Sequence, residues 1–192
     1  DMSKTFAVGT FANCVGVYTE EDMECVLEIG DLEFGVTHLK WSNCGNYLYI
    51  GGRKNDNILK WDVRNTREEV GRFTRTCNTN QKYIFDLDPW GKFLATGSQE
   101  GKIHIYDTTT FDLVKSSENL GDAVNSVAFH PFSSVLFSAT GQRHFELNED
   151  SSDDDEMENR NSNKRFKSDR SDIQVHKIGY NSLGRPEQSS RQ

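Results

Sequence analysis

The sequence contains no apolar run long enough to cross a bilayer, and no secretory signal opens it. We therefore expect no membrane partner. It also lacks an excess of positive charge, because 22 Lys and Arg stand against 30 Asp and Glu and give a formal net charge of −8. This balance excludes a global basic field that would recruit nucleic acid, so any such binding requires a local basic patch.

Cysteine is scarce and scattered. The cysteines form no C-x-x-C pair, which excludes the common zinc spacing and a small disulfide framework. Reduced, partly buried thiols of an intracellular protein are the expectation. The four residues are Cys14, Cys25, Cys44 and Cys77.

Sequence motifs that carry catalysis are absent as well. There is no G-x-S-x-G elbow, no P-loop, no G-x-G-x-x-G after a strand and no H-E-x-x-H. The histidines are spread over different positions, and none has metal-ligand spacing. Asp86 and Asp88 resemble a paired acid and base, but the repeat described next explains both. We expect no catalytic residue, no metal site and no cofactor, and hence a protein that is not an enzyme.

What the sequence does contain is a recurring hairpin. Residues 45–62, GNYLYIGGRKNDNILKWD, have the pattern of an apolar strand, a turn of glycine and Asx residues, and a second strand. Residues 91–107, GKFLATGSQEGKIHIYD, repeat that order. In three copies a glycine precedes an aromatic residue by nine positions, and the aromatic residues lie 43 and 45 positions apart.

A period of about 40–45 residues, with four strands and a closing aromatic-Asp pair, indicates an all-β fold, the WD-repeat β-propeller. We expect the ends of the third strands to close the blades structurally. The residues concerned are Tyr18, Trp61, Asp62, Tyr106 and Asp107.

The repeats divide the chain into two parts. We expect residues 1–145 to form a partial propeller of about three to four blades, with complete blades beginning near Val36 and Lys82 and partial ones on either side. The pattern stops after residues 141–145 without another aromatic-Asp strand. Residues 146–158 then hold eight Asp or Glu and no Lys or Arg. Because so few apolar side chains follow, we predict that residues 146–192 form a disordered charged tail.

Several polar residues should gather on one face of the propeller, where the turns after the second strands meet the connections between blades. Arg53 and Lys54 occupy such a turn, Lys82 lies in the connection 75–82, and Arg143 follows the fourth blade's second strand. Side chains of these types bind phosphates and base edges. A solvated polar rim is the alternative interpretation of the set.

One run is more specific than a generic repeat. Residues 79–89, TNQKYIFDLDP, with GKFL at 91–94 after them, resemble the telomerase Cajal body protein family, also known as the antisense-to-p53 proteins. Residues 59–64, LKWDVR, and 141–145, GQRHF, resemble neighbouring repeats of that family. The resemblance covers roughly residues 6–145, and we expect a carboxy-terminal fragment of a longer protein.

The resemblance implies an RNA-binding scaffold of small Cajal body ribonucleoproteins, without catalysis. Such a protein binds the Cajal body box of guide RNAs, and telomerase RNA in vertebrates. It associates with the H/ACA core proteins and directs the particles to Cajal bodies in the nucleus. The alternative is a generic WD-repeat protein–protein interaction scaffold without RNA binding, which the acidic net charge favours.

Overall fold

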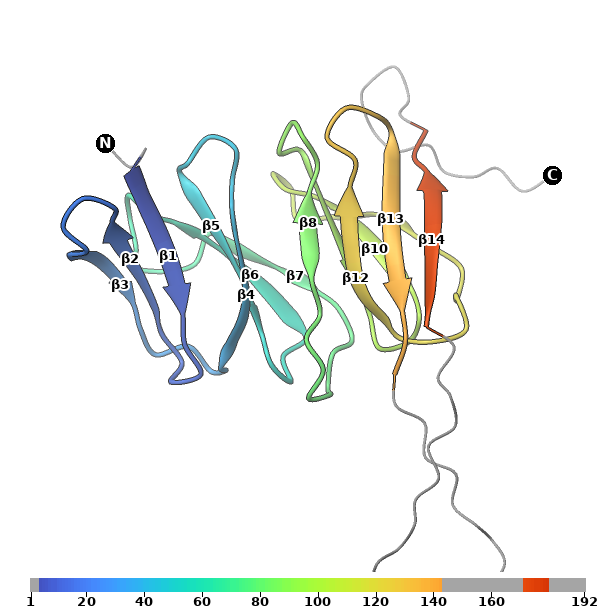
Figure 1. Ribbon diagram of the computed structural model, residues 1–192, viewed down its shortest axis with the longest axis horizontal. Helices are drawn as coiled ribbons and strands as arrows, with labels where there is room; N and C mark the ends of the chain where they lie inside the picture. The colour runs from blue at the N-terminus through green and yellow to red at the C-terminus, as the bar shows by residue number, and fades with distance from the viewer. Residues whose placement is uncertain (1–3, 143–170, 180–192) are drawn as a thin grey trace, which may run out of the picture.

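The computed structural model describes residues 4–142 and 171–179, and nearly all of their regular structure is β-strand (Figure 1). No helix among these residues has the length and apolar character needed to span a membrane. The strands form four antiparallel sheets, each following the order of the chain. The first sheet contains β1 (Thr5–Gly9), β2 (Val15–Thr19) and β3 (Cys25–Ile29). The second sheet contains β4 (Val36–Trp41), β5 (Tyr47–Gly52), β6 (Asn57–Asp62) and β7 (Gly71–Thr74). The third sheet contains β8 (Phe85–Leu87), β9 (Phe93–Gly97), β10 (Ile103–Asp107) and β11 (Leu113–Ser116). The fourth sheet contains β12 (Val124–Phe129), β13 (Val135–Thr140) and β14 (Asp172–Lys177).

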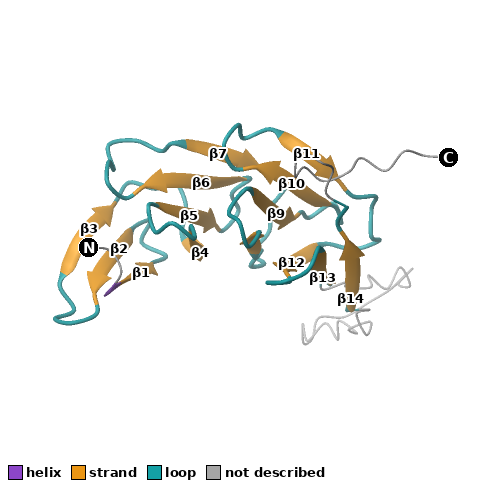
Figure 2. Cartoon of the chain, turned by 90° about the horizontal axis from the view of Figure 1, so that it is seen from above, coloured by secondary structure: helices purple, strands orange, loops and turns teal. Residues whose placement is uncertain are grey.

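The sheets stand side by side as the blades of a partial propeller. Seen from above, β3, β7 and β11 follow the outer side of the array, and β1, β4 and β12 lie on the opposite, inner side (Figure 2). An isolated bridge between Ile84 and Ser126 joins the third blade to the fourth. The all-β propeller prediction is confirmed.

Apolar side chains fill the spaces between blades. Val15, Leu48 and Ile50 belong to a cluster between the first and second blades. A second cluster, which includes Phe73 and Phe85, joins the second and third blades. Because each blade buries its faces against its neighbours, packing between blades is the main source of apolar burial.

The glycine that precedes each aromatic residue by nine positions has a packing role. A Cβ placed on Gly9 would overlap the side chain of Val36, and one on Gly97 would overlap Val124. Gly9 ends β1 and Gly97 ends β9, and the residues that they meet, Val36 and Val124, are the first residues of β4 and β12 in the next blade. Close approach of the next blade therefore requires glycine at this point in the repeat.

The structure corrects the prediction for the tail. Residues 172–177 form β14, which pairs antiparallel with β13, although the sequence predicted disorder from residue 146 onward. Two contacts hold the strand in addition to the backbone ladder. Ser138 Oγ lies 2.8 Å from His176 Nε2, and Ile178 is buried. His176 and Lys177 take the place of the aromatic-Asp pair, so the prediction that the fourth blade stops near residue 145 is also wrong. The acidic run 146–158 lies outside the described residues.

Candidate nucleic-acid interface

The β5–β6 turn and the connection between β7 and β8 reach the same face, at the bottom of Figure 1. The Arg53 guanidinium donates from Nε and Nη2 to Oδ1 of Asn80, at 3.0 and 2.7 Å. Arg53 is exposed, and its backbone N–H donates to Gly35 O at 2.9 Å. These bonds join a turn and a connection that are 27 residues apart in the sequence.

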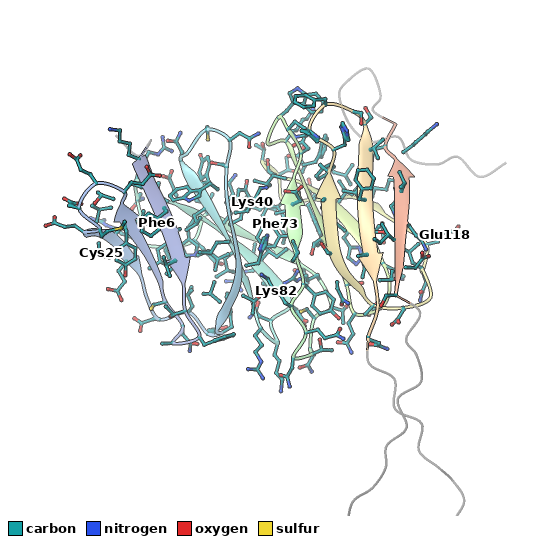
Figure 3. All side chains as sticks on the ribbon, viewed as in Figure 1. Phe6, Cys25, Lys40, Phe73, Lys82 and Glu118 are labelled. Carbon is teal, nitrogen blue, oxygen red and sulfur yellow. The ribbon has the colours of Figure 1, made fainter. Side chains whose placement is uncertain are left out.

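The other sequence-predicted cations flank this contact. Lys54 is exposed and has a left-handed backbone, with φ of 51°. Lys82 is exposed near the start of β8 (Figure 3). Arg143 lies outside the described residues. The structure thus brings Arg53 and Lys54 beside the connection that carries Lys82, and leaves Arg143 unplaced.

The acids in these turns have structural partners. Asp56 Oδ1 accepts the backbone N–H of Cys77 at 2.6 Å, and Glu100 Oε1 accepts the Thr76 hydroxyl at 3.1 Å. Asp56 thereby ties the β5–β6 turn to the connection that leaves its own blade, and Glu100 ties the β9–β10 turn of the next blade to the same connection. Neither carboxylate makes an ion pair with a described residue.

Arg75 is a buried cation beneath this face, and the sequence does not single it out from the rest of its loop. Arg75 is 1% exposed. Its Nη1 donates to Thr96 Oγ1 at 3.1 Å and to Tyr83 O at 3.4 Å, while Nε and Nη2 have no partner among the described residues. Burial lowers the pKa of Arg75. No described carboxylate forms an ion pair with it, so its positive charge is poorly compensated.

His38 lies near Arg75 and two lysines, Lys40 and Lys82. Its Nε2–H donates to Phe85 O at 3.1 Å. Burial lowers the pKa of His38 to about 4, with smaller contributions from the nearby cations Lys82, Lys40 and Arg75, although the hydrogen bond to Phe85 acts in the opposite direction. The imidazole is therefore neutral at pH 7.

The carboxylates of Asp86 and Asp88 already have ion-pair or hydrogen-bond partners within the propeller. Asp86 pairs with Lys40 at 2.8 Å and accepts the backbone N–H of Phe129 at 2.8 Å, which links three blades. Asp88 is buried and accepts the N–H of Phe93 at 2.8 Å within its own turn. The two acids have separate structural partners, which agrees with the interpretation of them as parts of the repeat.

The local charge balance is opposite to that of the whole chain. Segments 53–57, 75–84 and 98–102 hold five Lys or Arg and two Asp or Glu, a difference of three positive charges. The connections on either side are acidic, with Asp31 and Glu33 before β4 and Glu118 and Asp122 before β12. The positive patch is thus confined to the second and third blades.

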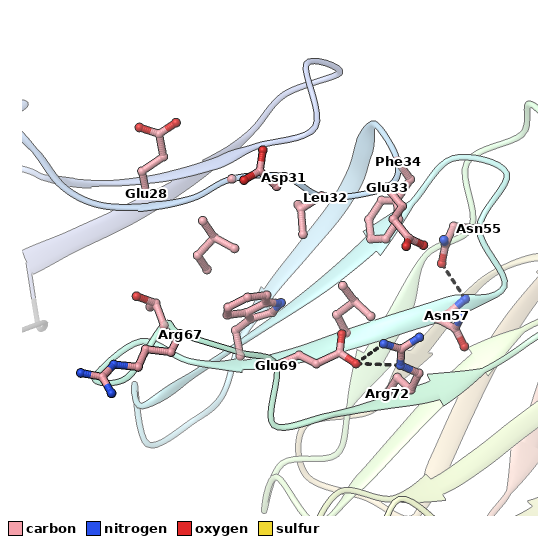
Figure 4. A pocket seen from close by; sticks show the side chains of 15 residues that line it. Glu28, Asp31, Leu32, Glu33, Phe34, Asn55, Asn57, Arg67, Glu69 and Arg72 are labelled. Carbon is pink, nitrogen blue, oxygen red and sulfur yellow. Dashed lines mark hydrogen bonds and ion pairs between the residues drawn. The ribbon is translucent and has the colours of Figure 1, made fainter.

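A hollow between the first and second blades has the opposite character (Figure 4). It has a volume of about 460 Å³ and is lined by four acids and two arginines. One arginine, Arg72, is already paired with Glu69. Trp61 contributes a buried Nε1 without a hydrogen-bond partner among the described residues. Because this hollow repels phosphate, it does not extend the positive patch.

The ends of the third strands differ from blade to blade. Tyr106 is buried and donates from its hydroxyl to Thr74 O of the neighbouring blade. Asp107 accepts the N–H groups of Thr109 and Thr110, which closes its turn. Asp62 instead accepts from Arg64, and Tyr18 stacks on Phe6 with ring centroids 5.7 Å apart.

No group of three or more potential metal ligands occurs in the part of the chain that the structure describes.

Comparison with known proteins agrees with this architecture. Residues 71–107 match the family model described as "WD domain, G-beta repeat". Telomerase Cajal body protein 1 of Bos taurus is 35% identical over 159 residues, which cover 80% of this chain and 29% of the relative. The Homo sapiens protein of that name is 33% identical, over 79% of this chain and 29% of the relative.

The chain is a WD-repeat relative of the telomerase Cajal body proteins. It spans about 30% of the length of these relatives. The guanine nucleotide-binding protein negative regulator 1 of Schizosaccharomyces pombe is also similar, with 34% identity over 80% of this chain and 39% of that protein.

Proposed function

We propose that this relative of the telomerase Cajal body proteins serves in an RNA-binding scaffold of small Cajal body ribonucleoproteins. It binds the Cajal body box of guide RNAs, and telomerase RNA, and acts without catalysis. The observation that carries the proposal is the confined positive patch, in which Arg53 donates to Asn80 and the connection that holds Asn80 also holds the poorly compensated Arg75. An acidic chain that concentrates cations on one face has the local patch that RNA binding requires.

The residues proposed to contact RNA are Arg53, Lys54 and Lys82, together with Arg143. Long cationic side chains contact phosphates, and the amides of the same loops offer hydrogen bonds to base edges. The names of the relatives contain the words "Cajal body" and support a location in nuclear Cajal bodies. Association with the H/ACA core proteins is a further part of the proposal.

The first test is the double substitution Arg53→Glu and Lys54→Glu in the full-length protein. RNA binding should weaken by several-fold or more. Each lost phosphate contact should reduce the slope of log affinity against log salt by about 0.7 for single-stranded RNA. The matched control is Lys4→Glu with Arg67→Glu, the same charge change at exposed positions outside the patch. Unchanged affinity and slope in the first variant would remove the patch from the interface.

A protein–protein scaffold without RNA binding is the second candidate. The net charge of −8 and the acid-lined hollow between the first and second blades favour it. Crosslinking and immunoprecipitation, with sequencing of the recovered RNA, separates the two. Guide RNAs sharing one loop motif support the RNA scaffold, whereas background RNA with proteins that remain bound after nuclease treatment supports the protein scaffold.

A further inference from the structure

A cavity opens on the opposite face from the positive patch, between the second and third blades. Its volume is about 370 Å³, within the range of about 300–1,000 Å³ that small-molecule sites occupy. The β4–β5 and β8–β9 turns, which lie at the top of Figure 1, form part of its wall. Strands β5 and β6 and the β10–β11 turn complete it. None of the described residues that line it is Asp or Glu.

Among the described residues that line this cavity, Lys60 is the only one with a charged side chain. It is 8% exposed, and its Nζ donates to Thr108 O at 2.9 Å. The ammonium also lies 4.2 Å from the centroid of the Tyr47 ring. No described carboxylate forms an ion pair with it. The ring centroids of Phe111 and Tyr49 lie 5.6 and 5.8 Å from it. A carbonyl and three rings leave the ammonium without an ion-paired carboxylate among the described residues, so the cavity favours an anion.

The pKa of Lys60 is consistent with this conclusion. Burial lowers it, because removing water disfavours the charged amine. Asp107 and Asp62 oppose this effect without forming an ion pair with Lys60, and an anion entering the cavity would raise that pKa further.

Aromatic and hydroxyl groups form the rest of the lining. Trp90 lines the cavity and is 69% exposed, so its indole lies at the rim. Tyr47 and Phe111 contribute further rings, and Ser42 and Thr109 contribute hydroxyls. A cation beside rings and hydroxyls matches a ligand in which a phosphate is joined to a planar base, since rings stack on bases and cations bind phosphates.

We propose that this cavity binds a nucleotide, with its phosphate at Lys60 and its base against Trp90. A free mononucleotide and a nucleotide within an RNA strand share this chemistry. The site lies on the face opposite Arg53 and Lys54, so it does not depend on the RNA interface proposed above.

Isothermal titration of the full-length protein tests the site with two kinds of probe. One is a set of four nucleoside 5′-monophosphates, and the other is a short single-stranded oligonucleotide. Lys60→Met should weaken binding by about tenfold, because a charge-assisted hydrogen bond is lost. Trp90→Ala should also weaken it by about tenfold through lost stacking. The control Lys4→Met removes an exposed lysine outside the cavity and should bind as the wild type does.

Each outcome decides the proposal. Mononucleotide binding that depends on Lys60 and Trp90 identifies a free nucleotide as the ligand, and oligonucleotide binding alone with the same dependence identifies RNA. The proposal is overturned if neither probe binds, or if Lys60→Met and Trp90→Ala both bind like the wild type. It is also overturned if a Glu-rich peptide occupies the cavity and nucleotides do not.

Two further measurements show whether a loss of binding arises in the cavity itself. Lys60 is buried, so circular dichroism must first show that Lys60→Met is folded, and the exposed Trp90 gives a variant that leaves the core intact. Arg53→Glu with Lys54→Glu should leave mononucleotide binding unchanged while weakening RNA binding. The failure of one site is thereby distinguished from the failure of the other.

Discussion

Acidification should destabilise this protein through His38. The ring is half-buried, donates to Phe85 O and lies edge-on to the Phe85 ring with centroids 4.7 Å apart. Its pKa falls from 6.5 to about 4 in the folded state. The unfolded chain therefore takes up a proton first as the pH falls. The stability contributed by neutral His38 is complete above pH 6.5 and is lost as the pH falls from 6.5 toward 4.

The size of the effect follows from the interval between the two pKa values. At about 1.4 kcal/mol per pH unit, the interval from 6.5 to about 4 corresponds to a loss of about 3 kcal/mol once His38 is fully protonated. At pH 5 the same linkage gives about 2 kcal/mol. For a fold of ordinary stability, about 5–15 kcal/mol, this is a measurable fraction.

Urea unfolding at pH 7.5 and pH 5 measures the loss, with His38→Gln as the reference. The amide of Gln has the hydrogen-bonding capacity to donate to Phe85 O but does not titrate. Carboxylates elsewhere change protonation in both proteins, so the difference between their pH dependences isolates His38. If wild type and His38→Gln lose the same free energy of unfolding between the two pH values, the reasoning about this buried imidazole is wrong.

Three further substitutions test the packing. Arg75→Met should leave the free energy of unfolding unchanged or raise it, because a poorly compensated buried charge is removed; a loss above about 2 kcal/mol on urea titration would contradict this. Gly97→Ala should cost about 1–3 kcal/mol, because its Cβ overlaps Val124, and a wild-type urea midpoint would show that the blades can separate there. Phe73→Ala should cost about 3–5 kcal/mol, since the ring is fully buried between blades, and a thermal melt like that of wild type would contradict it.

The repeat pattern predicted most strands because the propeller is built from local hairpins. The first strand of the second blade was expected to begin near Val36, where β4 begins, and the hairpins predicted at residues 45–62 and 91–107 correspond to β5–β6 and β9–β10. Alternation and turn residues are local signals, so the sequence alone contains them.

The two features that were missed have no local signal. β14 is separated from β13 by residues 141–171, and its aromatic position holds His176. Ile173 and Val175 are exposed, so their alternation does not mark a core-facing strand. Arg75 was placed in a polar loop, and nothing in a single sequence distinguishes a buried arginine from an exposed one. In both cases pairing with distant residues, Leu136 for His176 and Thr96 for Arg75, decides the outcome.

The phase of the repeat explains why the candidate interface lies between blades. The matched residues 71–107 begin with β7, the outer strand of the second blade, and end with β10 of the third. Each repeat therefore crosses from one blade to the next through a connection such as residues 75–84. That connection must carry polar groups, because it runs over the face of the propeller. It also lies against the turn of the preceding blade, as the bond from Arg53 to Asn80 shows. The proposed RNA contacts come from both blades, so the proposal predicts that RNA binding depends on the packing between blades that buries Phe73 and Phe85.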